Sequence, residues 1–164
     1  MRLRKVRQLE SYEYDILPLF LYNSIFQSDD EEMLEYSVIK DQSYAKYIND
    51  FGKDTDFAVA WELDGRIAGI AWVRLFDEAD ESFGYVDEIT PELTLSVLAG
   101  YDDQLIGPEL ISIVFNELRL QGAQKVSVSL DINDCYTSMY EKLGFEQLRV
   151  NADNTRVLFI KNLV

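Results

Sequence analysis

The chain has 164 residues, a formal net charge of −15, one cysteine and no histidine. The lack of histidine excludes a histidine general base, a Ser-His-Asp triad and a histidine-ligated metal. A single cysteine excludes an intramolecular disulfide and a zinc site built from several cysteines. The acidic excess argues against nucleic acid and anionic membranes as partners, because their phosphates would be repelled. It favours a cationic partner such as an amine, although a solubilising role explains the charge equally well.

Length and hydropathy limit the architecture and the location. No apolar run approaches the roughly 20 residues that cross a bilayer, and residues 1–10 lack the apolar segment of a signal peptide. Together with the lone Cys135, this favours a cytoplasmic protein. We expect one domain over residues 1–164, because this length suits a single hydrophobic core.

The N-terminal third predicts an edge strand and two helices. Residues 1–10 alternate charged and apolar side chains, as an edge strand does. A helix is expected over residues 14–26, with Pro18 near its first turn, where proline is tolerated. Residues 28–31 have the spacing of a capping box, so a second helix is expected to start there and to end at Gly52.

Three strands are expected next. Residues 57–63 and 66–76 flank Asp64-Gly65, a strong signal for a two-residue hairpin. Residues 77–81 form an acidic loop, and a third strand covers residues 92–97.

The last third alternates helices and strands. An apolar stripe predicts a helix over residues 108–121, stopped by Gly122. A strand with one buried face follows at residues 126–130, and Asn133 or Asp134 begins a short helix that ends at Gly144. Two final strands are expected at residues 145–150 and 156–163. The order β-α-α-β-β-β-α-β-α-β-β predicts an α/β fold with a mixed central sheet and helices on both faces.

Several segments in this order carry a resemblance to a known family. Residues 126–145 read VSVSLDINDCYTSMYEKLGF, and residues 95–101 read LSVLAGY, with Ala99 where the family has proline. Asn133 precedes Tyr140 by seven residues, and Asp134 occupies the alternative spacing. Together with residues 84–93, this set resembles the GNAT N-acetyltransferases, which transfer an acyl group from coenzyme A to an amine.

The resemblance implies a site for acetyl-CoA. The family's phosphate loop, Q/R-x-x-G-x-G/A, maps in one register onto Asp102, Leu105 and Gly107, and in another onto residues 104–109. Both registers depart from the family's pattern, and acidic side chains there weaken phosphate binding. Backbone amides of the strand before this loop would bind the pantetheine arm, and Asn133 would contact the same arm. The implied cofactor-binding residues are Val97, Leu98, Ala99, Gln104, Leu105, Ile106, Gly107 and Asn133.

Two side chains are the candidate catalytic groups. Glu92 occupies the family's frequent general-base position, with Asp87 and Glu88 as substitutes, or it is an ordinary strand residue. Tyr140 matches the tyrosine that protonates the leaving thiolate, or it is a packed aromatic side chain.

The predicted function is acyl-CoA-dependent N-acetylation of a primary amine by direct attack in a ternary complex. The acceptor would be a small-molecule or peptide amine of cationic character. Neither nucleic acid nor a membrane is expected as a partner, and a homodimer is left open. The alternative is a catalytically impaired GNAT-fold binding or regulatory module with weak or no coenzyme A binding.

Overall fold

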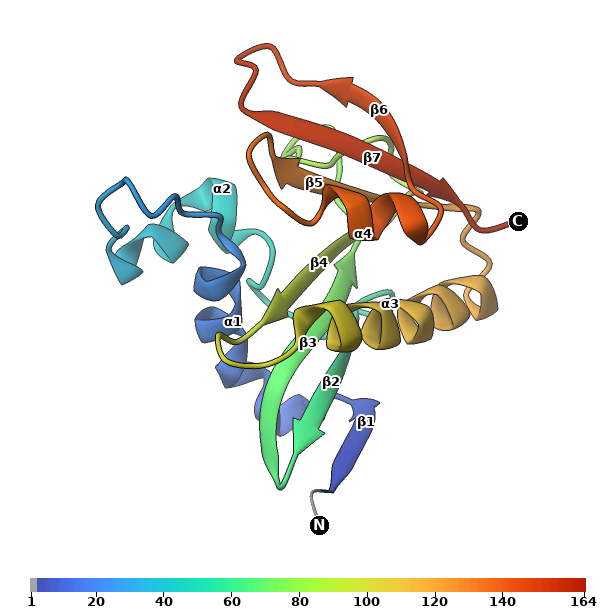
Figure 1. Ribbon diagram of the computed structural model, residues 1–164. Helices are drawn as coiled ribbons and strands as arrows, with labels where there is room; N and C mark the ends of the chain where they lie inside the picture. The colour runs from blue at the N-terminus through green and yellow to red at the C-terminus, as the bar shows by residue number, and fades with distance from the viewer. Residues whose placement is uncertain (1–2) are drawn as a thin grey trace.

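The computed structural model describes residues 3–164, and its strands form one seven-stranded sheet (Figure 1). The strand order is β1-β2-β3-β4-β5-β7-β6, and all neighbours are antiparallel except β4 and β5. The strands are β1 (Arg4–Gln8), β2 (Phe57–Leu63), β3 (Arg66–Arg74), β4 (Glu92–Val97), β5 (Lys125–Asp131), β6 (Glu146–Val150) and β7 (Arg156–Asn162).

Helices cover both faces of this sheet. On one face α3 and α4 pack with Val59 and Val73, whereas on the other α1 and α2 pack with Ala58 and Trp72. Because neighbouring strand residues point to opposite faces, the central strands β2 and β3 contribute to both hydrophobic clusters. The helices are α1 (Leu17–Ser24), α2 (Gln42–Ala45), α3 (Asp103–Leu120) and α4 (Thr137–Lys142), with 3-10 helices η1 (Ser11–Ile16) and η2 (Tyr36–Lys40).

The expected order of elements and the α/β class are confirmed. The hairpin forms as predicted, because Asp64 (φ 52°) and Gly65 (φ 82°) adopt the positive φ angles of a tight turn between β2 and β3. The expected edge strand is β1, which is paired only with β2.

The prediction of a second helix from residues 28–31 to Gly52 was wrong. Residues 28–31 form a turn, in which the Ser28 carbonyl accepts from the N–H of Glu31 (3.1 Å), and residues 32–35 have no regular secondary structure. Helical structure begins only with η2, and the extended backbone of Asp41 (ψ 134°) then separates η2 from α2. Asp41 instead caps α2, because its carboxylate accepts from the N–H of Ser43. The residues with capping-box spacing, 28–31, therefore form a local turn and do not start a helix.

The helix expected from Pro108 starts five residues earlier. The Asp102 carboxylate accepts from the N–H of Gln104 at 3.1 Å, and α3 begins at Asp103. An N-cap aspartate satisfies one of the free N–H groups of a helix start, and Pro108 is accommodated inside the helix. Residues 103–107, expected as a phosphate loop, are therefore the first turns of α3. The start of α4 also differs, at Thr137, although Gly144 ends it with φ 99°.

The two parallel strands at the centre of the sheet diverge almost at once. Their register contains a single pair, Glu92 with Ser127, and the Ser127 N–H donates to the Pro91 carbonyl at 3.0 Å. Beyond this pair β4 is hydrogen-bonded only to β3, and β5 only to β7. The sheet therefore opens between the two strands.

Candidate active site

A cleft occupies the opening between β4 and β5. It spans about 800 Å³, a volume that includes space open to solvent. Both candidate catalytic residues, Glu92 and Tyr140, line this cleft. Its other walls come from α1, α2, the segment before α4 and the start of β7.

Backbone groups of β4 point into this cleft. The Leu98 N–H donates to the Ala68 carbonyl at 2.8 Å, so by strand alternation the backbone groups of Leu95 and Val97 face β5. Among residues 3–164, the N–H groups of Leu95 and Val97 have no strand partner there. Asn23 of α1 covers one acceptor, since its Nδ2 donates to the Val97 carbonyl at 2.9 Å and to Ser96 Oγ at 2.8 Å.

Glu92 is the most deeply buried acid of the cleft. Its Oε1 accepts from Ser82 Oγ (2.5 Å) and from the Gly84 N–H (3.0 Å), whereas Oε2 accepts from the Tyr47 hydroxyl (2.5 Å). Burial raises the pKa of Glu92 above its usual range, and the three hydrogen bonds oppose that rise. Oε2 accepts one bond here, so it keeps a lone pair for another donor.

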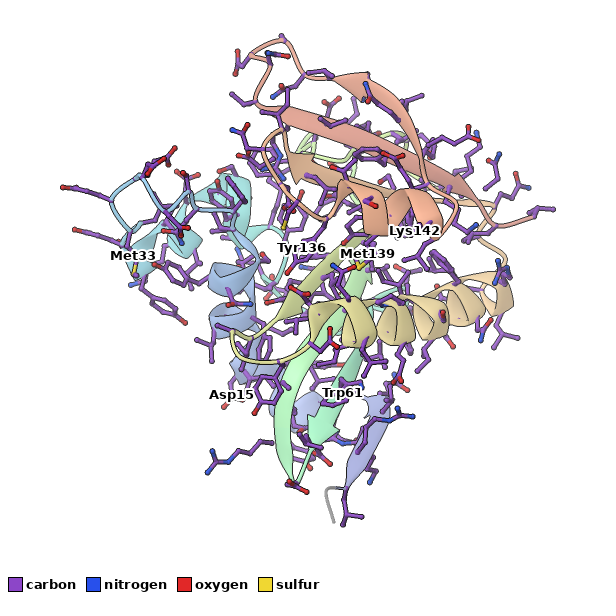
Figure 2. All side chains as sticks on the ribbon, viewed as in Figure 1. Asp15, Met33, Trp61, Tyr136, Met139 and Lys142 are labelled. Atoms are coloured by element: carbon purple, nitrogen blue, oxygen red, sulfur yellow. The ribbon has the colours of Figure 1, made fainter. Side chains whose placement is uncertain are left out.

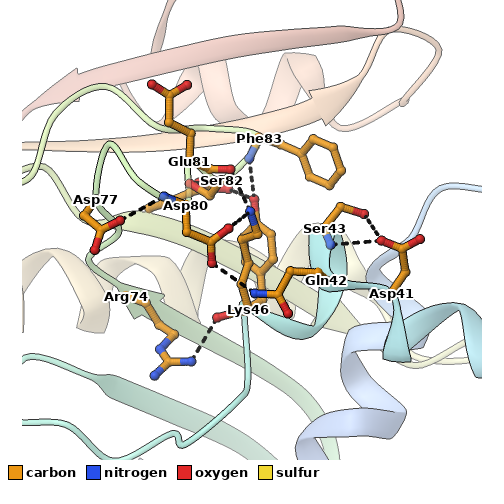
Figure 3. A network of polar contacts seen from close by, with 12 residues as sticks. Asp41, Gln42, Ser43, Lys46, Arg74, Asp77, Asp80, Glu81, Ser82 and Phe83 are labelled. Atoms are coloured by element: carbon orange, nitrogen blue, oxygen red, sulfur yellow. Dashed lines mark hydrogen bonds and ion pairs between the residues drawn. The ribbon is translucent and has the colours of Figure 1, made fainter.

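The loop between β3 and β4 is fixed by contacts to α2 and its flank (Figure 3). Lys46 Nζ lies 2.6 Å from Asp80 Oδ1 and donates to the Glu81 carbonyl at 2.8 Å. At the end of this loop the Phe83 N–H donates to the Tyr47 hydroxyl at 3.0 Å. These contacts place Ser82 and Gly84, which follow the acidic residues 77–81, against Glu92, so this loop orients the buried carboxylate.

Tyr140 of α4 approaches the cleft from the opposite face of the sheet. Tyr140 is 2% exposed, and its ring packs edge-on against Phe145, with the ring centroids 5.4 Å apart. The Tyr140 hydroxyl has no hydrogen-bond partner in the described chain. Every fully buried side-chain nitrogen or oxygen there has a partner, so this hydroxyl is not fully buried. The hydroxyl must therefore reach the cleft that its ring lines. Burial raises the pKa of Tyr140 well above its usual range, which keeps the phenol protonated.

The start of α3 carries an acidic contact across the cleft. The Tyr136 hydroxyl donates to Asp103 Oδ2 at 2.5 Å, which joins the segment before α4 to the first turn of α3. Figure 2 shows Tyr136 and Met139 between the C-terminal strands and α3. The Asp102 carboxylate occupies the Gln104 N–H, and the Asp102 carbonyl accepts from the N–H groups of Leu105 (3.2 Å) and Ile106 (2.9 Å). Three N–H groups of the helix start are thus already bonded.

A model of the acetyltransferase (GNAT) family matches residues 22–145 of this sequence. The chain belongs to the GNAT family. No curated protein matches it.

Solved structures of GNAT proteins share its fold. PaiA N-acetyltransferase from Thermoplasma acidophilum, in complex with coenzyme A, is 16% identical, with a TM-score of 0.72 over 98% of this chain and 99% of that one. Aminoglycoside 6'-acetyltransferase type Ii is 19% identical, with a TM-score of 0.68 over 98% and 97%. The ribosomal-protein-S18-alanine N-acetyltransferase of Escherichia coli is 12% identical, with a TM-score of 0.64 over 98% and 94%.

The residues expected to bind the cofactor are scattered in this GNAT structure. Val97 lines the cleft, but the Leu98 N–H is bonded to Ala68, so the expectation that this amide binds a ligand was wrong. Ala99 is exposed in the turn after β4. Gln104 and Leu105 are exposed on the first turn of α3, whereas Ile106 and Gly107 are buried against the sheet. Ile106 and Gly107 therefore cannot touch a ligand at the surface, and for them the assignment was also wrong.

The assignment of Asn133 to the pantetheine arm stays a prediction. Asn133 is exposed, its N–H donates to the Asp131 carboxylate at 2.9 Å, and it is absent from the cleft lining. Asp134, at the alternative spacing, lines the cleft and accepts from the Tyr136 N–H at 2.8 Å. Burial raises the pKa of Asp134.

Sequence reasoning missed four residues of the site. Asn23, Tyr47, Ser82 and Arg156 all contact cleft-lining groups but lie far apart in the chain. Only Tyr47 had a signal, as one of the aromatic residues in the second helical region. No pattern in the sequence pairs it with Glu92, 45 residues away.

Residues 3–164 contain no cluster of three or more acidic or cysteine side chains arranged to hold a metal ion. Within the same residues, every helix is too short or too polar to span a bilayer.

Proposed function

We propose that the chain is an acyl-CoA-dependent N-acetyltransferase that acts on a primary amine by direct attack in a ternary complex. One observation carries this proposal: the cleft at the β4–β5 opening is lined by Glu92 from one face of the sheet and by Tyr140 from the other. A proton acceptor and a proton donor thus face one cavity, which is what transfer from a thioester to an amine requires.

The cleft suits the pantetheine arm of coenzyme A. That arm is extended and carries two amides, and the free N–H groups of Leu95 and Val97 supply strand-like donors along β4. When bound, the cofactor would supply an activated acyl group as a thioester. An N–H group of β4 near the thioester carbonyl would stabilise the negative charge that develops on its oxygen.

Glu92 would accept the proton of the amine. An alkylammonium group has a pKa of about 10.4 and must lose a proton before it can attack. The raised pKa of Glu92 makes its carboxylate a stronger base at neutral pH than an exposed glutamate. Its bonds from Tyr47 and Ser82 fix the carboxylate, so Oε2 can take a proton directly or through one water.

Tyr140 would donate a proton to the departing thiolate. Its hydroxyl is protonated at neutral pH and has no protein acceptor among the described residues. A donor whose hydrogen is not already bonded is available to a developing negative charge without first breaking another contact.

A second function is favoured by the start of α3. Asp102 and Asp103 stand where the diphosphate of the cofactor would bind, and the Tyr136 hydroxyl is bonded to Asp103. Helix starts bind anions through free N–H groups, but here the Gln104 N–H is taken by a carboxylate. The alternative is thus a GNAT-fold binding or regulatory module with weak or no coenzyme A binding.

Two measurements separate these functions. Calorimetry with coenzyme A reports affinity, and release of free thiol from acetyl-CoA reports transfer to a panel of primary amines. The transferase proposal expects binding and a thiol release that Tyr140→Phe reduces. Weak or absent coenzyme A binding together with no turnover refutes the transferase and supports the module.

A further inference from the structure

Arg156 is a cation held at the wall of the active-site cleft. It is the first residue of β7 and is half-buried. Its guanidinium stacks on the Phe83 ring at 4.2 Å from the centroid. Nε donates to Ser129 Oγ at 2.8 Å, and Nη2 donates to the Ser129 carbonyl at 3.2 Å. The group is therefore fixed in place by one ring and one neighbouring strand.

This guanidinium has no carboxylate partner in residues 3–164. Arg4, Arg7 and Arg74 each form an ion pair, but none of the ion pairs there includes Arg156. The chain has 30 acidic and 15 basic residues, so an unpaired arginine inside a cleft is unexpected. Nη1 makes no hydrogen bond within the described chain, and it leaves donors directed away from Ser129.

The acids that line the cleft are held by other groups. Glu92 accepts from Tyr47, Ser82 and Gly84. The carboxylates of Asp131 and Asp134 accept from the backbone N–H groups two residues further along the chain. Burial raises the pKa of Glu92 and of Asp134, and the positive charge of Arg156 opposes that rise in both, so its field reaches both. Its free donors are available to a ligand.

Strand alternation places Arg156 on the same side of the sheet as Glu92. Val157 and Phe159 belong to the hydrophobic cluster under α3 and α4, so Arg156 points to the opposite face. Phe83, on which it stacks, donates through its N–H to Tyr47, the partner of Glu92. A ligand bound to Arg156 therefore lies on the face from which Glu92 would deprotonate an amine.

We propose that Arg156 binds a carboxylate on the acceptor, and that the acceptor is an amine that also carries a carboxylate, such as an amino acid. This inference rests on the proposed transferase function. The planar guanidinium pairs with a carboxylate through parallel hydrogen bonds. A doubly charged phosphate is disfavoured, because Glu92, Asp131 and Asp134 line the same cleft. The acceptor is then zwitterionic, and not purely cationic as the net charge suggested.

Matched pairs of acceptors test this proposal. Each amino acid is compared with its carboxamide, which has the same side chain and amine but no carboxylate. The ratio of their kcat/KM values is measured for the wild type, Arg156→Lys, Arg156→Gln and Arg149→Gln. Dividing the ratio of each variant by that of the wild type cancels the different basicity of the two amines.

Arg149 provides the matched control. It is an exposed arginine of β6 that donates to the Tyr85 carbonyl at 3.0 Å and does not line the cleft. We expect Arg156→Gln to reduce the relative preference for the carboxylate by about 10- to 100-fold, the range for a hydrogen-bonded charge pair. Arg156→Lys keeps the positive charge but lacks the planar guanidinium, so it should reduce the preference for the carboxylate less than Arg156→Gln does. Arg149→Gln should leave it unchanged.

A binding measurement separates this inference from the proposed function. Calorimetric titration of the same acceptor pairs onto the protein needs no turnover. Carboxylate-dependent binding that is lost in Arg156→Gln supports the site even if no amine is acetylated. Turnover with an unchanged preference in Arg156→Gln overturns the inference and leaves the transferase intact. If carboxylate acceptors bind no better than carboxamides and no preference exists in turnover, Arg156 does not recognise the acceptor. Should Arg156→Gln fail to fold, the same criteria apply to Arg156→Lys.

Discussion

The acidic start of α3 should limit the affinity for coenzyme A, and removing its charge should raise that affinity. Asp102→Asn keeps an N-cap side chain for Gln104, and Asp103→Asn keeps an oxygen that can accept from Tyr136. The double variant therefore removes two negative charges while it preserves the local hydrogen bonds. Any change in affinity then reports electrostatics.

Coulomb's law gives the size of this effect. For each carboxylate about 7 Å from a phosphate charge in a medium with the dielectric constant of water, the repulsion is about 0.6 kcal/mol. Two carboxylates give about 1.2 kcal/mol, or about eightfold in the dissociation constant at low salt. At 0.15 M salt the Debye length of about 8 Å reduces the repulsion to less than half, so the gain falls to about twofold.

Calorimetry with coenzyme A at low and at physiological salt measures both values. Glu117→Gln is the control, since it removes one negative charge from the same helix. Residue 117 is 14 positions beyond Asp103, about 21 Å along α3 at 1.5 Å per residue. At that distance the charge is screened at physiological salt. An unchanged affinity in the double variant at low salt, or an equal gain in Glu117→Gln, would refute a diphosphate at this helix start.

Three further changes test other parts of the site and the fold. Tyr140→Phe should reduce thiol release by about 100-fold, the lower range for general acid catalysis. Its thermal stability should change little, because the hydroxyl has no protein partner in the described chain. A large loss of stability would indicate that Tyr140 has a packing role instead. Gly84→Ala should reduce kcat/KM but not coenzyme A binding, since a Cβ there would lie 2.6 Å from the Glu92 Cδ, and unaltered turnover would show that the position of this carboxylate is unimportant. Hydrogen bonds from Arg7 lower the pKa of Glu13 from 4.5 to about 2, so they contribute stability that is present above pH 4.5 and is lost as the pH falls toward 2. Urea unfolding at pH 6 and pH 3 should therefore show a larger acid-induced loss for the wild type than for Glu13→Gln, and equal losses would show that the pair contributes nothing.

The parts of the fold that the sequence predicted are those with local causes. The Asp64-Gly65 turn fixes the register between β2 and β3, because both residues tolerate positive φ. The apolar stripe of α3 and the glycine after it marked the C-terminal end of that helix within one residue. The alternation of Val126 and Val128 marked β5 for the same reason, since both are buried on one face.

The start of α3 was predicted at Pro108, five residues too late. Pro108 is common at the first position of a helix, but Asp102 is a stronger start, because its side chain bonds a free N–H. The family's loop spacing favoured the later start, and the structure places those residues in the helix. The prediction of one helix over residues 28–52 was wrong for a different reason. Side chains of Gln27, Ser28 and Asp41 accept hydrogen bonds from backbone N–H groups there and stabilise turns and a cap in place of one continuous helix.

Most partners of the candidate catalytic residues could not be predicted, because they meet only through tertiary packing. Glu92 and Tyr140 were found through their positions in motifs. Tyr47 and Ser82 reach Glu92 because α2 and the loop before β4 are packed together by Lys46 and Asp80. An isolated lysine and an acidic loop are ordinary surface features in a sequence, and their ion pair is specified only by the fold.

The position of the proposed base and the opening of the sheet depend on one residue. Ser127 donates its N–H to the Pro91 carbonyl (3.0 Å) and forms, with Glu92, the single registered pair between β4 and β5. Its Oγ donates to the Gly84 carbonyl (2.7 Å), and the Gly84 N–H donates to Glu92 Oε1 (3.0 Å). Ser127 is fully buried, so these bonds are not exchanged with water. The strand that opens the cleft for an extended ligand therefore also holds the carboxylate at its closed end, and a shift of β5 would move both together.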